Sequence, residues 1–167
     1  MIFGKSSQLI DTLGKLYIRD VALEHVTSYR YLGFHLLSDS KLRFSSTESL
    51  RGFFGAVNSV LSVLKKPNEY VLMQLLYSTC VPKLMYGAAV KDLTSNEKHQ
   101  YNVAVNNAVR SIFKFRYWQS IRQLREFYHY EPIEVMFAKA RKRFHASLVT
   151  HRNGTLRFLS SLVVEPS

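Results

Sequence analysis

The stretch TSNEKHQYNVAVNNAVRSIF, residues 94–113, decides the fold class. Thr94 and Glu97 stand three residues apart, which is the spacing of a capping box, where each side chain bonds the other residue's backbone amide. Apolar side chains then recur every three or four residues and share one face of a helix. They are Tyr101, Ala104, Val105, Ala108, Val109, Ile112 and Phe113. The stretch therefore predicts a capped helix with one buried face.

Two more helices are predicted before this stretch, because apolar residues recur there at the same spacing. The first starts near residue 50 and is stopped by Pro67. The second opens at Asn68, a residue type that caps helices, and is expected to end near Pro82. The expected core positions are Leu50, Phe53, Phe54, Val57, Val60, Leu61 and Leu64 in the first helix, and Val71, Leu72, Leu75, Leu76 and Cys80 in the second.

Two segments after it also have helical signatures. Ser120 and Gln123 repeat the capping-box spacing, and Pro132 fits the first turn of a last long helix. After Gly154, only LRFLSSLVV, residues 156–164, is predicted to be ordered. The core stripe of the long helix is expected to be Ile133, Met136, Phe137, Ala140, Phe144 and Leu148.

Short β-strands are predicted in the first part of the chain. MIF (1–3), KLYI (15–18) and VALEHV (21–26) are β-prone, and the dipeptide Arg19-Asp20 lies where a tight turn would join the last two. SYRYLGFHLL (28–37) is interpreted as a strand with Gly33 inside it. A glycine within a strand marks a bulge or the close approach of another backbone.

The sequence therefore predicts an α+β fold, mostly α, with a short antiparallel β-hairpin region followed by a helical bundle. Residues 1–38 are expected to be β-rich, residues 39–152 to be helical, and residues 153–167 to form a short tail.

The charge balance favours a polyanionic partner. Lys and Arg total 23 against 12 Asp and Glu, which gives a formal net charge of +11. Such an excess points to nucleic acid before an anionic membrane surface, and no apolar run approaches the roughly 18 residues that would span a bilayer. Cys80 is the single cysteine, and the first residues do not resemble a signal peptide. We therefore expect an intracellular chain, cytoplasmic or nuclear, with no membrane partner.

Signs of catalysis are few. The four aspartates are dispersed, and no histidine has a histidine partner four residues away. Cys80 lies in an apolar helix and is interpreted as a core thiol. We expect no catalytic residue, no metal site and no cofactor in this chain.

Basic residues gather in two places. The first basic cluster is Arg110, Lys114, Arg116, Arg122 and Arg125, and it runs past Tyr117 and Trp118. The second basic cluster is Lys139, Arg141, Lys142 and Arg143, in a stretch without acidic residues from Val135 to Val164. Guanidinium groups beside exposed aromatic rings suit phosphate pairing and base stacking. A solvated helix face is the alternative for the second cluster, and Phe113 and Trp118 could instead belong to the core.

Five segments in order carry a family resemblance: MIFGK (1–5), YRYLGF (29–34), LLYSTCVPKLMYGAAV (75–90), NNAVRSIFKF (106–115) and SIRQLREFYHYEPIEVMFAKARKRF (120–144). Together they resemble the end of the reverse transcriptase domain of non-LTR (LINE-type) retrotransposons, from the last palm strands through the thumb. The resemblance covers roughly residues 1 to 150. Val90 departs from it, because many relatives have a tryptophan there.

The resemblance implies roles for particular residues. Tyr31, Leu32 and Gly33 would belong to the primer-grip hairpin, where Gly33 lets the backbone approach the primer strand. Residues 1–38 would be a palm remnant, and the helices would form a thumb that follows an RNA–DNA hybrid through its backbone. The implied nucleic-acid contacts in this thumb are Arg110, Lys114, Arg116, Lys139, Arg141, Lys142 and Arg143.

The catalytic aspartates of that family would lie before residue 1, so Mg²⁺ is expected only in the missing palm, and this chain alone is expected to be inactive. The implied partners are an RNA–DNA hybrid or RNA, together with the absent palm and fingers of the parent polymerase. An alternative is a stand-alone basic helical module that binds RNA or a partner protein and has no enzymatic role.

Overall fold

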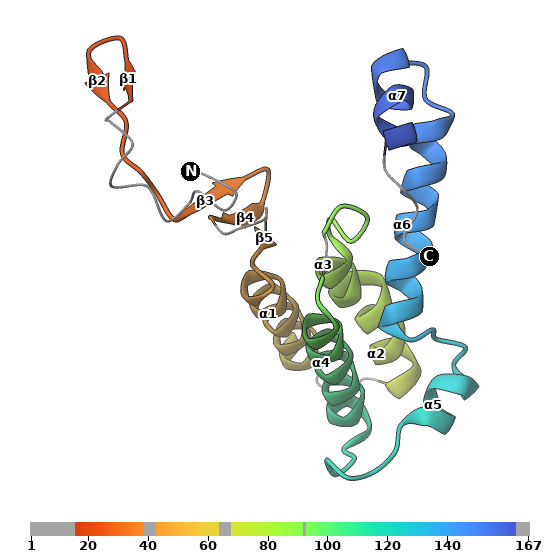
Figure 1. The fold of residues 1–167 in the computed structure, drawn as a ribbon. Helices are drawn as coiled ribbons and strands as arrows, with labels where there is room; N and C mark the ends of the chain where they lie inside the picture. Colours follow the sequence, from red (N-terminus) through yellow and green to blue (C-terminus); the bar gives the residue numbers. More distant parts are fainter. Residues whose placement is uncertain (1–15, 39–42, 64–67, 92, 163–167) are drawn as a thin grey trace. The chain divides into compact units, whose positions relative to one another are not determined.

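A computed structural model describes residues 16–38, 43–63, 68–91 and 93–162 of the chain (Figure 1). The chain divides into two compact units, unit 1 (Met1–Ser49) and unit 2 (Leu50–Ser167). The described part is mostly helical, with two small antiparallel sheets in unit 1, so the predicted α+β fold is confirmed.

The first sheet of unit 1 is a hairpin of two very short strands. β1 (Tyr17–Ile18) pairs antiparallel with β2 (Val21–Ala22), and Ile18 lies opposite Val21. The predicted turn at Arg19-Asp20 is therefore confirmed, and Arg19 adopts a φ of 45° to form it. The side chains of this hairpin are exposed, including those of Tyr17, Ile18 and Val21.

The second sheet corrects the interpretation of residues 28–37 as one strand. β3 (Ser28–Tyr31) and β4 (Phe34–Leu37) form a hairpin in which Tyr31 lies opposite Phe34. Leu32 and Gly33 make the turn with φ values of 48° and 79°. Two central residues with positive φ are the signature of the tight turn whose twist matches paired strands. Gly33 thus lies in a turn instead of inside a strand.

A third strand of this sheet was not predicted. β5 (Arg43–Phe44) pairs with the end of β4, and the rings of Phe34 and Phe44 meet edge to face at 5.5 Å between centroids. Two residues are too few for a period-2 pattern to be visible, which is why this segment was assigned to the helical part. The predicted strand at residues 1–3 lies outside the described residues.

Helices make up unit 2, and the first of them begins just before it. Figure 1 shows α6 and α7 packed side by side, and α4 contacts both α2 and α6. The helices are α1 (Thr47–Val63), α2 (Glu69–Leu75), the π-helical turn η2 (Leu76–Cys80), α3 (Val81–Met85), α4 (Ser95–Phe113), α5 (Arg122–Phe127), α6 (Ile133–Val149) and α7 (Gly154–Leu162).

Pro82 does not end its helix, contrary to the prediction. The chain turns through η2 and continues into α3, with Pro82 in the first turn of α3. The amide of Val81 bonds the carbonyl of Leu76, five residues back. Proline has no amide hydrogen to donate, and a widened turn just before it keeps the helix continuous.

The caps follow the sequence at two helices and depart from it at a third. Asn68 Oδ1 accepts from the Tyr70 amide at 2.8 Å, and the Thr94–Glu97 capping box is complete. The box predicted at Ser120 does not form: α5 starts one residue later, with Ile121 at its N-cap. Ile121 is buried in the core, and this packing sets where the helix can start.

The core of unit 2 lies between α1, α2, η2, α3, α4 and the start of α6. Six of the seven apolar positions predicted for α4 are buried, and Phe113 is half-buried against them. Met73 is fully buried although it was not predicted, whereas Phe54, Val71 and Phe144 are exposed. In α6 only the first turns enter the core, which explains why the predicted stripe is buried at Ile133 and Phe137 and more exposed beyond them.

Candidate nucleic-acid interface

The hairpin turn of unit 1 presents its residues to solvent. The side chains of Tyr31 and Leu32 are 58% and 69% exposed, and Gly33 is exposed with them. A type I′-like turn projects beyond the strands that it joins, and Gly33 adds no side chain there. The backbone of residues 32 and 33 is therefore open to close approach by another molecule.

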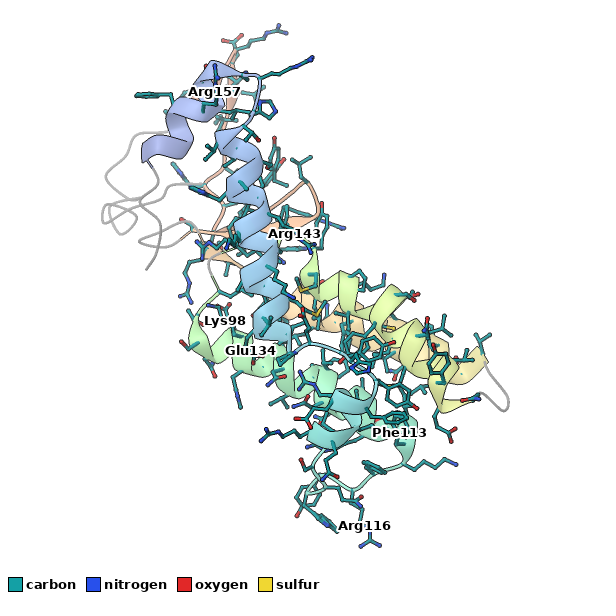
Figure 2. All side chains as sticks on the ribbon, turned by 90° about the vertical axis from the view of Figure 1, so that its right-hand side faces the viewer. Lys98, Phe113, Arg116, Glu134, Arg143 and Arg157 are labelled. Atoms are coloured by element: carbon teal, nitrogen blue, oxygen red, sulfur yellow. The ribbon has the colours of Figure 1, made fainter. Side chains whose placement is uncertain are left out.

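The first basic cluster begins where α4 ends. Lys114 adopts the left-handed conformation, with a φ of 53°, and the amide of Phe115 reaches back to the carbonyl of Arg110 at 2.9 Å. This is the usual way to close a helix, although glycine normally occupies the left-handed position. The chain then leaves the helix sharply and projects the segment 114–120 outward (Figure 2).

That projecting segment carries exposed aromatic rings beside a cation. Tyr117 and Trp118 are 81% and 60% exposed, so Trp118 does not belong to the core. The guanidinium of Arg116 lies over the Trp118 ring, 5.2 Å from its centroid, and the Tyr117 ring meets Trp118 edge-on at 4.8 Å. Cation–π contact keeps the positive charge of Arg116 at the surface next to a flat apolar face.

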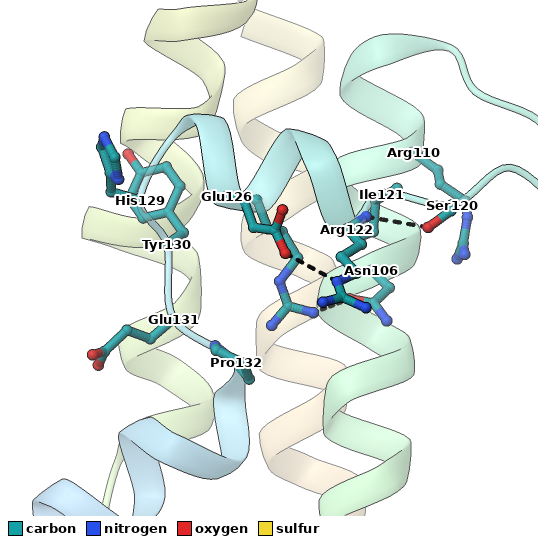
Figure 3. Close-up of a pocket in the computed structure, with 11 residues that line it drawn as sticks. Asn106, Arg110, Ser120, Ile121, Arg122, Glu126, His129, Tyr130, Glu131 and Pro132 are labelled. Atoms are coloured by element: carbon teal, nitrogen blue, oxygen red, sulfur yellow. Dashed lines mark hydrogen bonds and ion pairs between the residues drawn. The ribbon is translucent and has the colours of Figure 1, made fainter.

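A pocket of about 760 Å³ lies between the end of α4, α5 and the segment after α5 (Figure 3). It contains three arginines of the first basic cluster, Arg110, Arg122 and Arg125. Lys114 and Arg116 do not line it. The other lining residues are Asn106, Ser120, Ile121, Glu126, His129, Tyr130, Glu131 and Pro132.

Neutral oxygens hold two of the three arginines. Arg125 donates from Nη1 to Asn106 Oδ1 at 3.0 Å and to Asn102 Oδ1 at 3.4 Å. Arg110 donates to Asn107 Oδ1 at 3.0 Å and to the carbonyl oxygen of Gln119 at 3.2 Å. Amide and carbonyl oxygens orient a guanidinium group without neutralising its charge.

The third arginine of the pocket is paired with an acid. Arg122 forms an exposed ion pair with Glu126, four residues on in α5, at 2.9 Å. Sequence reasoning grouped these arginines but missed the pocket. The asparagines on α4 were the available signal, because Asn102 and Asn106 are four residues apart and share a helix face, and Asn107 stands three residues before Arg110.

The pocket-lining Tyr130 packs against a second tyrosine, Tyr77. The rings of Tyr77 and Tyr130 stack in parallel with their centroids 3.7 Å apart. Burial raises the pKa of both phenols, and the nearby Arg125 guanidinium partly opposes this for Tyr77. The Tyr77 hydroxyl and Arg125 Nη2 are both buried without a hydrogen-bond partner. Arg125 therefore holds its charge in a partly desolvated place.

The second basic cluster lies along α6. Lys139, Arg141, Lys142 and Arg143 are all exposed, and Lys139 is ion-paired with Glu131. Successive residues of a helix point about 100° apart, so Lys139, Lys142 and Arg143, at spacings of three and four residues, share one face of α6, whereas Arg141 points to another side. Lys139 reaches the pocket-lining Glu131, whereas in Figure 2 Arg143 lies along α6 and away from Arg116, so the structure does not gather the two clusters into one surface.

Other candidate features give a plain result. Cys80 is a free, fully buried thiol whose pKa is raised by burial, in agreement with its interpretation as a core residue. Among the described residues, no three His, Cys, Asp or Glu side chains are placed to hold a metal ion together. Within the same residues, no helix has both the length and the apolar character needed to cross a membrane.

Comparison with known proteins assigns no family. Neither a protein-family model, nor a curated protein, nor a solved structure matches the chain significantly.

Proposed function

We propose that the chain is part of an RNA-directed DNA polymerase of the non-LTR retrotransposon type, and that it binds the nucleic-acid duplex without catalysing synthesis. The observation that carries this proposal is the pair Arg110 and Arg125, which are oriented by neutral oxygens and keep their charge for a ligand. The net charge of +11 and the exposed turn at Leu32–Gly33 support it.

In this proposal the basic side chains and the hairpin turn contact different parts of the duplex. Lys114 and Arg116 at the projecting end of α4, and the cationic side chains of α6, contact phosphates of an RNA–DNA hybrid. The hairpin turn contacts the primer strand through its backbone. No Asp-Asp pair occurs in the sequence, so the chemistry is assigned to residues outside this chain.

A salt titration of duplex binding tests the proposal. Each phosphate contact contributes to the slope of log affinity against log salt. If only three of the proposed cations contact phosphates, the affinity for an RNA–DNA hybrid is expected to fall roughly 40-fold between about 50 and 200 mM salt. The Arg116→Gln variant is expected to reduce that slope by about one contact. Lys83→Gln removes the same charge from an exposed position on α3 outside both clusters, and is expected to leave the slope as it is. An affinity independent of salt would contradict the proposal.

The compact core of unit 2 favours a second candidate function, a stand-alone module that binds RNA. All residues of the core cluster lie between Phe53 and Phe137, within unit 2. A thumb follows A-form duplex geometry, so the first proposal predicts tighter binding to the hybrid than to single-stranded RNA of the same sequence. Equal or tighter binding to the single strand would favour the module.

A further inference from the structure

The pocket beside α5 holds the two arginines on which the proposed function rests, and its charge balance indicates which kind of phosphate they bind. Its two acids already have cationic partners: Glu126 pairs with Arg122, and Glu131 pairs with Lys139 of α6. Arg110 and Arg125 have no carboxylate partner among the described residues. Two positive charges in the pocket therefore remain without a carboxylate partner among the described residues.

The position of Arg125 makes this imbalance costly. Its side chain is partly buried, and its Nη2 atom is buried with no hydrogen-bond partner. A cation that is removed from water without an anion loses solvation free energy, and the asparagine oxygens bonded to Arg125 Nη1 restore only part of it. An anion bound in the pocket would offset that loss.

We infer that this pocket binds the terminal phosphate of a nucleic-acid strand. A phosphate monoester carries roughly two negative charges at neutral pH, whereas a phosphodiester within a strand carries one. The monoester matches the two uncompensated guanidinium groups of Arg110 and Arg125. Guanidinium groups also fit phosphate oxygens in paired hydrogen bonds, which an ammonium group cannot reproduce.

The volume of the pocket agrees with such a ligand. About 760 Å³ is within the range of small-molecule sites and accommodates a terminal nucleotide with its phosphate. The pocket is also part of the first basic cluster, so a strand held by the proposed interface can place its end there. In this respect the inference rests on the proposed function, which supplies the strand.

The test compares single-stranded oligonucleotides of one sequence that carry a 5′-phosphate, a 3′-phosphate or only hydroxyl ends. With the full chain, fluorescence anisotropy is expected to show about tenfold tighter binding of one phosphorylated strand, the gain of one added hydrogen bond to a charged group. Equal affinity for all three strands would overturn the pocket inference and leave the proposed function standing. If the chain binds neither the hybrid nor any of the three strands, the proposed function is wrong.

Variants locate the effect. Arg125→Gln is expected to abolish the preference for the phosphorylated end while binding of the hydroxyl strand persists. Because Arg125 also bonds Asn102 and Asn106, its variant could unfold, and Arg110→Gln provides a second test at an independent position. Lys83→Gln matches the change in charge outside the pocket and is expected to retain the preference. A preference that survives both arginine variants would overturn the assignment to this pocket.

Inorganic phosphate distinguishes a pocket for the terminal phosphate of a strand from a pocket for free phosphate. As a competitor it is expected to remove only the part of the affinity that depends on the terminal phosphate. If inorganic phosphate raises the melting temperature of the chain but no phosphorylated strand binds better than the hydroxyl strand, the pocket takes free phosphate and the strand-end inference is wrong.

Discussion

Gly52 and Gly87 show how the same residue type has opposite energetic roles in one unit. Gly52 lies within α1, and a Cβ atom added there would meet nothing within 4 Å. Gly87 follows α3 with a φ of 69°, a conformation that L-residues rarely adopt. Glycine at position 52 lowers stability, because it leaves the unfolded chain more conformational freedom. Glycine at position 87 favours stability, because a residue with a Cβ atom is strained at that φ.

We therefore predict that Gly52→Ala raises the free energy of unfolding by about 1 kcal/mol, since alanine has the higher helix propensity. Gly87→Ala is expected to lower it by about 1 kcal/mol, the cost of a left-handed backbone for a residue with a Cβ atom. Urea denaturation monitored by circular dichroism measures both. Changes of the same sign would contradict either the helical backbone at Gly52 or the left-handed backbone at Gly87.

At the scale of single residues, the sequence located the basic side chains but not their partners. Arg110 and Arg125 were recognisable as cations. Arg110 bonds Asn107 within α4 itself, whereas Arg125 of α5 is oriented by Asn102 and Asn106, which belong to another element. Such partners depend on how α4 and α5 pack, and local composition does not contain that information.

At the scale of elements, α4 shows what the sequence predicts well. Its cap and its buried face were both predicted, because both depend on spacings of three and four residues within one segment. The predicted box at Ser120 has the same spacing and does not form, since burial of Ile121 shifts the start of α5. The strand β5 was likewise set by its pairing with β4, which spacing within one segment does not indicate.

The cap of α4 gives a prediction at this scale. Thr94→Ala removes the hydroxyl that accepts from the Glu97 amide at 3.3 Å and donates to the Glu97 carboxylate at 2.8 Å. We expect a loss of about 1 kcal/mol in the free energy of unfolding. Ser95→Ala, one residue further along and exposed, is the matched control and is expected to change stability little. Equal effects of the two variants would contradict a specific role for the cap.

At the scale of the whole molecule, the two units differ in how their residues are buried. The described residues 16–37 are exposed or half-buried, while unit 2 contains the core cluster. Composition predicted enough apolar residues for a core, and helical periodicity placed that core in the second part of the chain. Pairing of the short strands depended on turn conformation, which the sequence indicated at Arg19-Asp20 but not between β4 and β5.

This difference predicts unequal protection from hydrogen exchange. Amides of β1 to β4 are expected to exchange by local opening, at rates close to those of an unfolded segment, because small sheets without a covering layer are marginally stable. Amides in the middle of α4 are expected to exchange only through global unfolding. Exchange measured by mass spectrometry on the full chain checks this, and equal protection of the two units would contradict a marginally stable unit 1.

The β1–β2 hairpin has a practical consequence for the life of the protein in a cell. Tyr17, Ile18 and Val21 expose apolar side chains on a two-stranded hairpin. Exposed apolar segments of this kind resemble what chaperones and proteases recognise in incompletely folded chains. Unless another surface covers this hairpin, the abundance of the chain depends on how quickly chaperones and proteases bind the hairpin.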